Sequence, residues 1–340
     1  MIDVQRLRVL RAVAEHGSFN RAAASLRLTP SAVSQQVAAL ERGLGAQVVA
    51  RSTRGVTLTR AGQIMVGAAE SVAAELAHAQ QQVSALGTGR TQLTLATFTS
   101  GGRLLLPAAL NRLTAAHPRT ALHVREGEPE DTLPLVRQGA VDLALAYHFD
   151  GPLPAGPAPG GRLTWTPLLE DPLHIVLPQG HRLAHHEALD LADLAAEPWV
   201  LGCLKTEAFL RRFAERAGFS PDIRGTTTDY FFARSLVAAG MGISLIPSIA
   251  LTPGIPGLST VPITLPGPVR HIGVATIGGR DRPHLTTLLD SLREEAKRHE
   301  GHRSGTSPAD AGSGAPRDQG ASCPCHDAPC CERMVWDRPM

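Results

Sequence analysis

Residues 27–42 read RLTPSAVSQQVAALER and predict a sharp turn followed by a helix with two different faces. Thr29 can cap this helix, and Pro30 suits its first position because no helical hydrogen bond is lost there. The apolar residues recur every three or four positions and form an inner face: Val33, Val37 and Leu40. The outer face carries short or amide side chains: Ser31, Ser34, Gln35 and Ala38. Serine and glutamine can hydrogen-bond to base edges in the DNA major groove, whereas the alternative is an ordinary polar helix surface.

The segments around this helix complete a known arrangement. An apolar helical pattern in residues 7–14 stops at His16-Gly17, and Ser18 can cap a second helix over residues 20–26. Residues 47–50 and 56–59 alternate as two short strands around a turn at 52–55, and Gly43 and Gly45 are expected to close the helix before them. Two helices joined by a turn, with a hairpin behind them, predict a winged helix-turn-helix.

Charge separates this head from the remainder of the chain. Residues 1–60 hold nine arginines and three acidic residues, whereas the whole chain of 340 residues has a net charge of only +2. A basic head on a near-neutral body favours a polyanionic partner at one end, with chance unevenness as the alternative.

Residues 61–86 predict one long helix with a heptad seam. Apolar residues follow one another at intervals of four and three positions: Met65, Ala69, Val72, Leu76, Ala79, Val83 and Leu86. Such a seam needs a partner helix. The same helix of a second subunit would serve, and packing within the chain is the alternative.

The body from residue 91 alternates strands with helices. Strands are expected at 92–97, 121–125, 141–146, 173–177, 199–202, 243–246 and 271–276, with helices between them and a last helix at 283–299. This alternation predicts two α/β lobes with largely parallel sheets and a ligand cleft beyond the carboxyl ends of the strands.

The chain resembles the LysR-type transcriptional regulators, most specifically in its first 65 residues. The resemblance is carried by residues 10–19, 22–24, 31–41 and 51–62 of the head, and by residues 139–144 and 239–247 of the body. It extends to about residue 299. One departure is Val48-Val49-Ala50, where the family usually has Leu, Phe and a polar residue, so we expect a wing that packs slightly differently.

The resemblance implies a fold and an activity. The fold would be α/β multidomain: a winged helix-turn-helix (1–60), a dimerising linker helix (61–89) and a two-lobed effector domain like a periplasmic binding protein. Lobe I would take residues 91–163 and 268–299, and lobe II residues 164–267. Such proteins bind promoter DNA in the cytoplasm as homodimers or homotetramers and respond to a small effector.

Two sets of site residues follow. For DNA we expect Pro30, Ser31, Ser34 and Gln35 at the bases, and Arg51 and Arg54 at phosphates. For an effector, hydroxyls and free helix N–H groups at strand-to-helix turns favour a small anion. The expected residues are Thr99, Ser100, Gly202, Cys203, Lys205 and Thr228. Helix capping by the hydroxyls, a solvated Lys205 and an incidental Cys203 are the alternatives, and Cys203 could also sense oxidants.

Several classes of protein are not expected. No nucleophile elbow, phosphate loop or HExxH motif occurs, so the sequence predicts neither an enzyme nor a bound cofactor. A membrane span or secretory signal is likewise not expected. The segment 300–340 is rich in Gly, Ser and Pro and should be disordered; its cysteines could bind a soft metal, or have no role. A ligand-independent or a thiol- or metal-responsive regulator stays open as an alternative.

Overall fold

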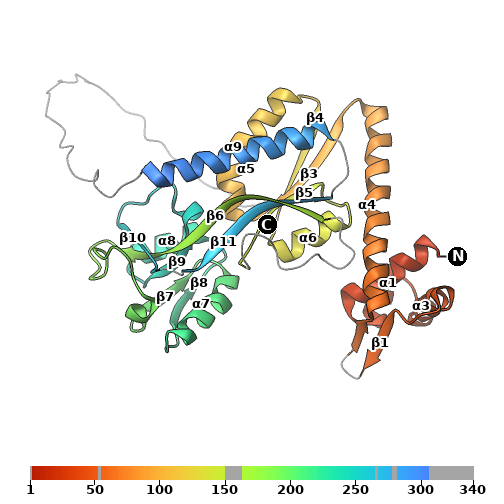
Figure 1. Cartoon of the computed structure of the whole chain (residues 1–340), viewed down its shortest axis with the longest axis horizontal. Helices are drawn as coiled ribbons and strands as arrows, with labels where there is room; N and C mark the ends of the chain where they lie inside the picture. The colour runs from red at the N-terminus through yellow and green to blue at the C-terminus, as the bar shows by residue number, and fades with distance from the viewer. Residues whose placement is uncertain (1, 53–54, 150–162, 265–266, 278–281, 306–340) are drawn as a thin grey trace, which may run out of the picture. The chain divides into compact units, whose positions relative to one another are not determined.

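The computed structural model describes residues 2–52, 55–149, 163–264, 267–277 and 282–305 (Figure 1). The Pro/Gly-rich segment 151–161, Arg54 and the cysteines of the C-terminal segment lie outside these residues. No helix in the described part of the chain is long and apolar enough to cross a membrane.

The head is the expected winged helix-turn-helix. Three helices, α1 (Val4–His16), α2 (Phe19–Leu26) and α3 (Pro30–Leu44), precede an antiparallel hairpin of β1 (Val49–Ser52) and β2 (Gly55–Leu58). Their apolar faces form one core, which includes the inner face predicted for α3. Only Gly45 closes α3, with a φ of 68°, because Gly43 lies inside the helix.

Local hydrogen bonds fix the ends of the recognition helix and the wing. The Thr29 hydroxyl accepts a bond from the backbone N–H of Ala32, as predicted for the cap. The Glu41 carboxylate accepts a bond of 2.9 Å from the backbone N–H of Val48 and so ties the hairpin to α3. Gly62 is needed where the next helix begins, because a Cβ there would lie 1.9 Å from the Val48 carbonyl oxygen.

The linker helix α4 (Arg60–Thr88) is continuous over 29 residues, as the heptad pattern predicted. The two halves of its apolar seam have different surroundings. Met65 and Ala69 pack on the core of the head, which corrects the expectation that the whole seam meets a partner helix. Leu76, Val83 and Leu86 are exposed by 53%, 68% and 87%. The C-terminal half of the seam is therefore open on this chain.

Lobe I is built on three parallel strands. β3 (Thr91–Thr97) lies between β4 (Thr120–Glu126) and β5 (Leu143–His148). The helices α5 (Thr99–Ala116) and α9 (Pro283–Gly305) share the main apolar core on one face, and α6 (Pro129–Arg137) packs on the other (Figure 1). The chain thus returns to lobe I after lobe II, as expected.

Lobe II contains a second set of short elements. β7 (Pro198–Leu201) and β8 (Asp222–Thr226) are parallel, and α7 (Leu204–Arg216) and α8 (Tyr230–Ala238) follow them. β9 (Ser244–Pro247) and β10 (Leu258–Pro262) pair with β6 (Leu163–Pro178). Two single turns of 3-10 helix, η1 (Leu191–Leu194) and η2 (Ser248–Leu251), complete the lobe.

Two long strands connect the lobes and correct the prediction of largely parallel sheets. β6 pairs antiparallel with β11 (Val269–Ile277) in its first part and with β9 and β10 in its last, and β11 also pairs antiparallel with β5. The main sheet is therefore mixed. Its crossing strands place the end of lobe I beside the start of lobe II.

Candidate functional site

The helix predicted to read DNA presents its polar face outward. Pro30 occupies the first turn of α3, and Pro30, Ser31 and Gln35 are exposed, whereas Ser34 is half-buried. The backbone of Arg51 lies on β1, and Arg54 lies outside the described residues. The fold thus brings the four predicted base-contacting residues to one end and one side of a single helix.

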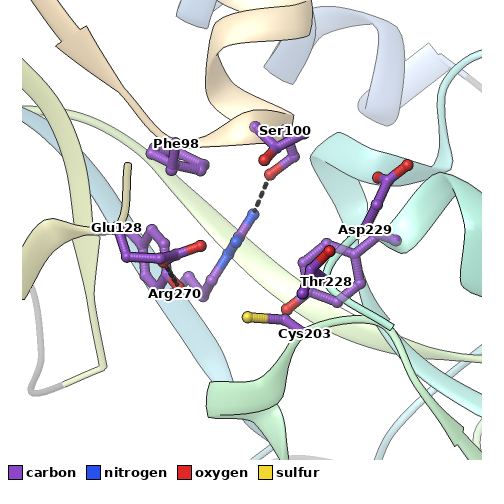
Figure 2. Close-up of a pocket in the computed structure, with 10 residues that line it drawn as sticks. Phe98, Ser100, Glu128, Cys203, Thr228, Asp229 and Arg270 are labelled. Carbon is purple, nitrogen blue, oxygen red and sulfur yellow. Dashed lines mark hydrogen bonds between the residues drawn. The ribbon is translucent and has the colours of Figure 1, made fainter. Parts of the chain in front are cut away.

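A small cavity lies where the two lobes meet (Figure 2). Lobe I contributes the start of α5, the start of α6 and β5, whereas lobe II contributes the starts of α7 and α8; Arg270 enters from β11. The lining residues are Phe98, Thr99, Ser100, Glu128, Tyr147, Cys203, Thr228, Asp229, Tyr230 and Arg270. This is the place that the strand-to-helix turns predicted.

Arg270 forms the base of the cavity. Its side chain is 1% exposed and pairs with the buried carboxylate of Asp171 at 2.6 Å. Another guanidinium N–H donates to the Ser100 hydroxyl at 3.2 Å, the contact drawn in Figure 2. Burial alone would lower the pKa of Arg270, but the Asp171 carboxylate, together with Tyr230 and Tyr147, outweighs it, so the pKa lies above its usual range. Arg270 is therefore a fixed positive charge.

Aromatic rings enclose the Arg270 guanidinium. Its central carbon lies 4.6 Å from the ring centre of Tyr147, 5.3 Å from that of Phe98 and 5.7 Å from that of Tyr230. Gly202 makes room for one of these rings, because a Cβ on it would lie 2.3 Å from the Tyr230 ring. The rings attract the cation and hold it in a single place.

Glu128 and Tyr147 form a second polar pair. The Tyr147 hydroxyl donates a hydrogen bond of 2.7 Å to the Glu128 carboxylate. Burial raises the pKa of the Tyr147 phenol well above its usual value, and the negative charge of Glu128 raises it further. Tyr147 is therefore a permanent donor, and Glu128 is held against one wall of the cavity.

Cys203 contributes a thiol to the lining of the cavity. It is the only cysteine in the described part of the chain, it is buried, and it forms no disulfide. It occupies the N-cap of α7, whose dipole stabilises negative charge that develops on the sulfur. In Figure 2 the sulfur points toward Glu128 and Arg270.

Sequence reasoning named four of the ten residues that line this cavity. Thr99, Ser100, Cys203 and Thr228 line the cavity together, whereas Gly202 packs under Tyr230 and the side chain of Lys205 is not described. The aromatic residues, the carboxylates and Arg270 were missed. A signal for Arg270 existed, because an arginine inside the apolar strand VRHIGVATI needs a buried partner.

The cavity is small and its charges do not favour an anion. The centre of a water-sized molecule has only about 10 Å³ in which to move. The charge of Arg270 is matched by Asp171, and the Glu128 carboxylate adds negative charge. No group of three or more His, Cys, Asp or Glu that could hold a metal occurs in the described residues.

Two family models match consecutive parts of the chain. The model described as "Bacterial regulatory helix-turn-helix protein, lysR family" matches residues 4–63, and the one described as "LysR substrate binding domain" matches residues 87–297. Together they cover the head and both lobes.

Curated relatives cover almost the same range. A "Probable hydrogen peroxide-inducible genes activator" of Mycobacterium avium is 32% identical over 85% of this chain and 91% of its own length. The "DNA-binding transcriptional dual regulator OxyR" of Escherichia coli is 28% identical over 88% of this chain and 97% of its own length.

Solved structures share the fold. A cysteine mutant of Corynebacterium glutamicum OxyR is 23% identical, with a TM-score of 0.53 over 89% of this chain and 94% of that one. A second such mutant, described as H2O2-bound, is 24% identical, with a TM-score of 0.52 over 89% and 96%. The relatives named above are transcription regulators and not enzymes. Because family models match both the DNA-binding head and the effector lobes, the chain belongs to the LysR family of DNA-binding transcription regulators.

Proposed function

We propose that this regulator controls promoter DNA in response to a small, neutral oxidant such as hydrogen peroxide, which reacts with Cys203. The observation that carries the proposal is a cavity of molecular dimensions around a buried thiol, with a fixed cation beside it. Two of the relatives carry names that describe them as activators, one of them a probable activator, of hydrogen peroxide-inducible genes, which points the same way.

Size argues for an oxidant over a larger effector. Sites for drug-sized ligands hold roughly 300–1,000 Å³, and one water needs about 10–15 Å³ for its centre. The volume beside Cys203 that is open to the centre of a water molecule, about 10 Å³, is close to that needed for one water. We therefore favour a neutral molecule of two or three heavy atoms in place of the small anion that the helix termini suggested.

The reaction is a displacement at oxygen. The Cys203 thiolate attacks one oxygen of the peroxide, a sulfur–oxygen bond forms, and the oxygen–oxygen bond breaks. The leaving hydroxide takes up a proton and departs as water. The product is a sulfenic acid at Cys203. Arg270 stabilises the negative charge that passes to the leaving oxygen.

Oxidation would act on DNA binding through the packing of the lobes. A sulfenic oxygen adds a heavy atom to a cavity with little free space, and close-packed interfaces respond by shifting between discrete arrangements. The guanidinium of Arg103 on α5 lies 3.7 Å from the ring centre of Phe231 on α8, so one contact near the cavity already joins the two lobes. A change at Cys203 would alter how the two lobes pack at this contact.

On DNA, the roles follow the exposed face of α3. Ser31, Ser34 and Gln35 would contact base edges, Pro30 would lie near a thymine methyl, and Arg51 and Arg54 would hold phosphates. The open half of the α4 seam would pair with the same helix of a second subunit, giving a homodimer or a larger assembly. The regulator would act in the cytoplasm, where promoter DNA is located.

The test is a gel shift with DNA from the upstream intergenic region, using protein that is reduced or treated with hydrogen peroxide. The wild-type protein should change its affinity or footprint after treatment, and the Cys203→Ser variant should bind DNA but stay unchanged. A peroxide response of undiminished size in Cys203→Ser would refute the proposal.

A further inference from the structure

The carboxylate of Glu128 has a position that capping does not explain. Glu128 is the N-cap residue of α6, yet its side chain makes no capping hydrogen bond. It instead accepts the bond from the Tyr147 hydroxyl and lines the cavity that contains Cys203. The chain therefore directs a negative charge toward its reactive thiol.

Tyr147 keeps that carboxylate in place. Its ring is 7% exposed and packs edge-on against Phe98 at 4.8 Å between ring centres. The other side of the ring meets the guanidinium of Arg270. A buried, immobile donor of this kind fixes the acceptor that it binds.

The charges around the cavity allow the Glu128 carboxylate to discriminate between anionic and neutral reagents. Among the lining residues Arg270 is the one cation, and its charge is already matched by Asp171. Asp229 also lines the cavity, although its carboxylate caps α8 by accepting from the N–H of Phe231. An anionic reagent approaching Cys203 is repelled by Glu128. A hydroperoxide is neutral, and its O–H can donate to the same carboxylate.

We propose that Glu128 is a specificity-determining residue, positioned by Tyr147, which excludes anionic oxidants from Cys203 and admits neutral hydroperoxides. The inference rests on the proposed function, because it concerns the selectivity of the same thiol. Repulsion between two unit charges in the same small cavity, where water screens part of it, can alter a rate by roughly tenfold or more.

The test uses two reagents that differ in charge and hardly in shape, iodoacetamide and iodoacetate. In both, the thiolate forms a bond to carbon and iodide leaves. The rate at Cys203 is measured by peptide mapping in the full chain. The ratio of the amide rate to the acetate rate cancels changes in the fraction of thiolate. That ratio should fall about tenfold in Glu128→Gln.

Two further variants sharpen the result. Tyr147→Phe should lower the ratio by a smaller factor, since the carboxylate stays but is no longer held, and it tests the inference even if Glu128→Gln folds poorly. Glu130→Gln removes the same charge from an exposed position two residues along α6 and should leave the ratio unchanged.

The outcomes separate the two claims. If hydrogen peroxide oxidises Cys203 but the ratio in both Glu128→Gln and Tyr147→Phe stays within twofold of wild type, the inference is overturned and the proposed function stands. If Cys203 of the folded protein reacts with hydrogen peroxide no faster than in the denatured chain, both are overturned.

Discussion

In the proposed function, single side chains determine what α3 recognises on DNA and what the cavity between the lobes admits. On α3 the outward residues are small or amide-bearing, so the helix can enter a groove without steric obstruction. In the cavity, one buried arginine depends on one buried aspartate, and that pair touches several strands and turns at once.

Gln35→Ala should weaken specific DNA binding. A bidentate contact to adenine is worth about 1–3 kcal/mol, which corresponds to roughly 5- to 150-fold in affinity. Fluorescence anisotropy with the operator and with random DNA measures this at two salt concentrations. Gln36→Ala, one residue further on a different side of α3, is the matched control. Equal losses in the two variants would remove Gln35 from the base contacts.

Asp171→Asn should destabilise the effector lobes. The Asp171 carboxylate accepts from Arg270 and from the backbone N–H of Ile249, so its loss leaves a buried cation without its counter-charge. The expected cost is about 3–5 kcal/mol in the free energy of unfolding by urea. Asp222→Asn breaks an exposed pair with Arg224 and should cost less than about 1 kcal/mol. Similar costs for both variants would contradict this role of Asp171.

At the scale of elements, α4 and α9 carry features with consequences in solution. α4 exposes the C-terminal half of its heptad seam, and α9 begins beside a half-buried histidine. The first feature can be tested through the mass of the assembly, and the second through the pH dependence of stability.

The double substitution Val83→Glu with Leu86→Glu should shift the protein toward monomers. Charges on a seam that pairs with a second helix are repelled and desolvated, whereas on a free surface they cost nothing. Light scattering after gel filtration gives the mass. Gln82→Glu adds charge at an exposed neighbouring position and should leave the mass unchanged. An unchanged mass in the double variant would place the subunit interface elsewhere.

Acidification should weaken the fold through His284. Burial lowers the pKa of this histidine, and the nearby cation of Arg282 lowers it further. The unfolded chain therefore takes up a proton below its own pKa near 6.5 while the folded chain does not, so stability is complete above that pH and declines below it. Unfolding midpoints between pH 7.5 and 5 should fall less steeply in His284→Asn than in wild type. The exposed His186→Asn should not alter the slope.

Local sequence predicted the elements better than their pairing. The cap at Thr29, the inner face of α3 and the continuous α4 follow from residues a few positions apart. The mixed sheet depends on β6, whose two ends pair with different partners, and residues 163–172 carry no clear alternation. The cavity shows the same division. Thr99 and Cys203 were named because they follow strands. Glu128 also follows a strand, β4, but its hydrogen bond to Tyr147 on β5 is made by tertiary packing and has no signal in the local sequence.

At the scale of the whole molecule, the proposed function couples one thiol to one DNA-binding surface. The two crossing strands β6 and β11 link the lobes, and the cavity lies at their junction with the helix starts. A chemical change there can alter how the lobes pack, and through the family's shared architecture this would alter how paired heads meet DNA.

The most direct test measures oxidation and DNA binding in the same samples. Peroxide is titrated onto the protein, the oxidised fraction of Cys203 is measured by mass spectrometry, and the operator affinity by anisotropy. The tail thiols are replaced in a parallel variant carrying serine at Cys323, Cys325, Cys330 and Cys331. Affinity should follow the oxidised fraction of Cys203 with the same midpoint in both proteins. A response that disappears with the tail cysteines, or that precedes oxidation of Cys203, would contradict it.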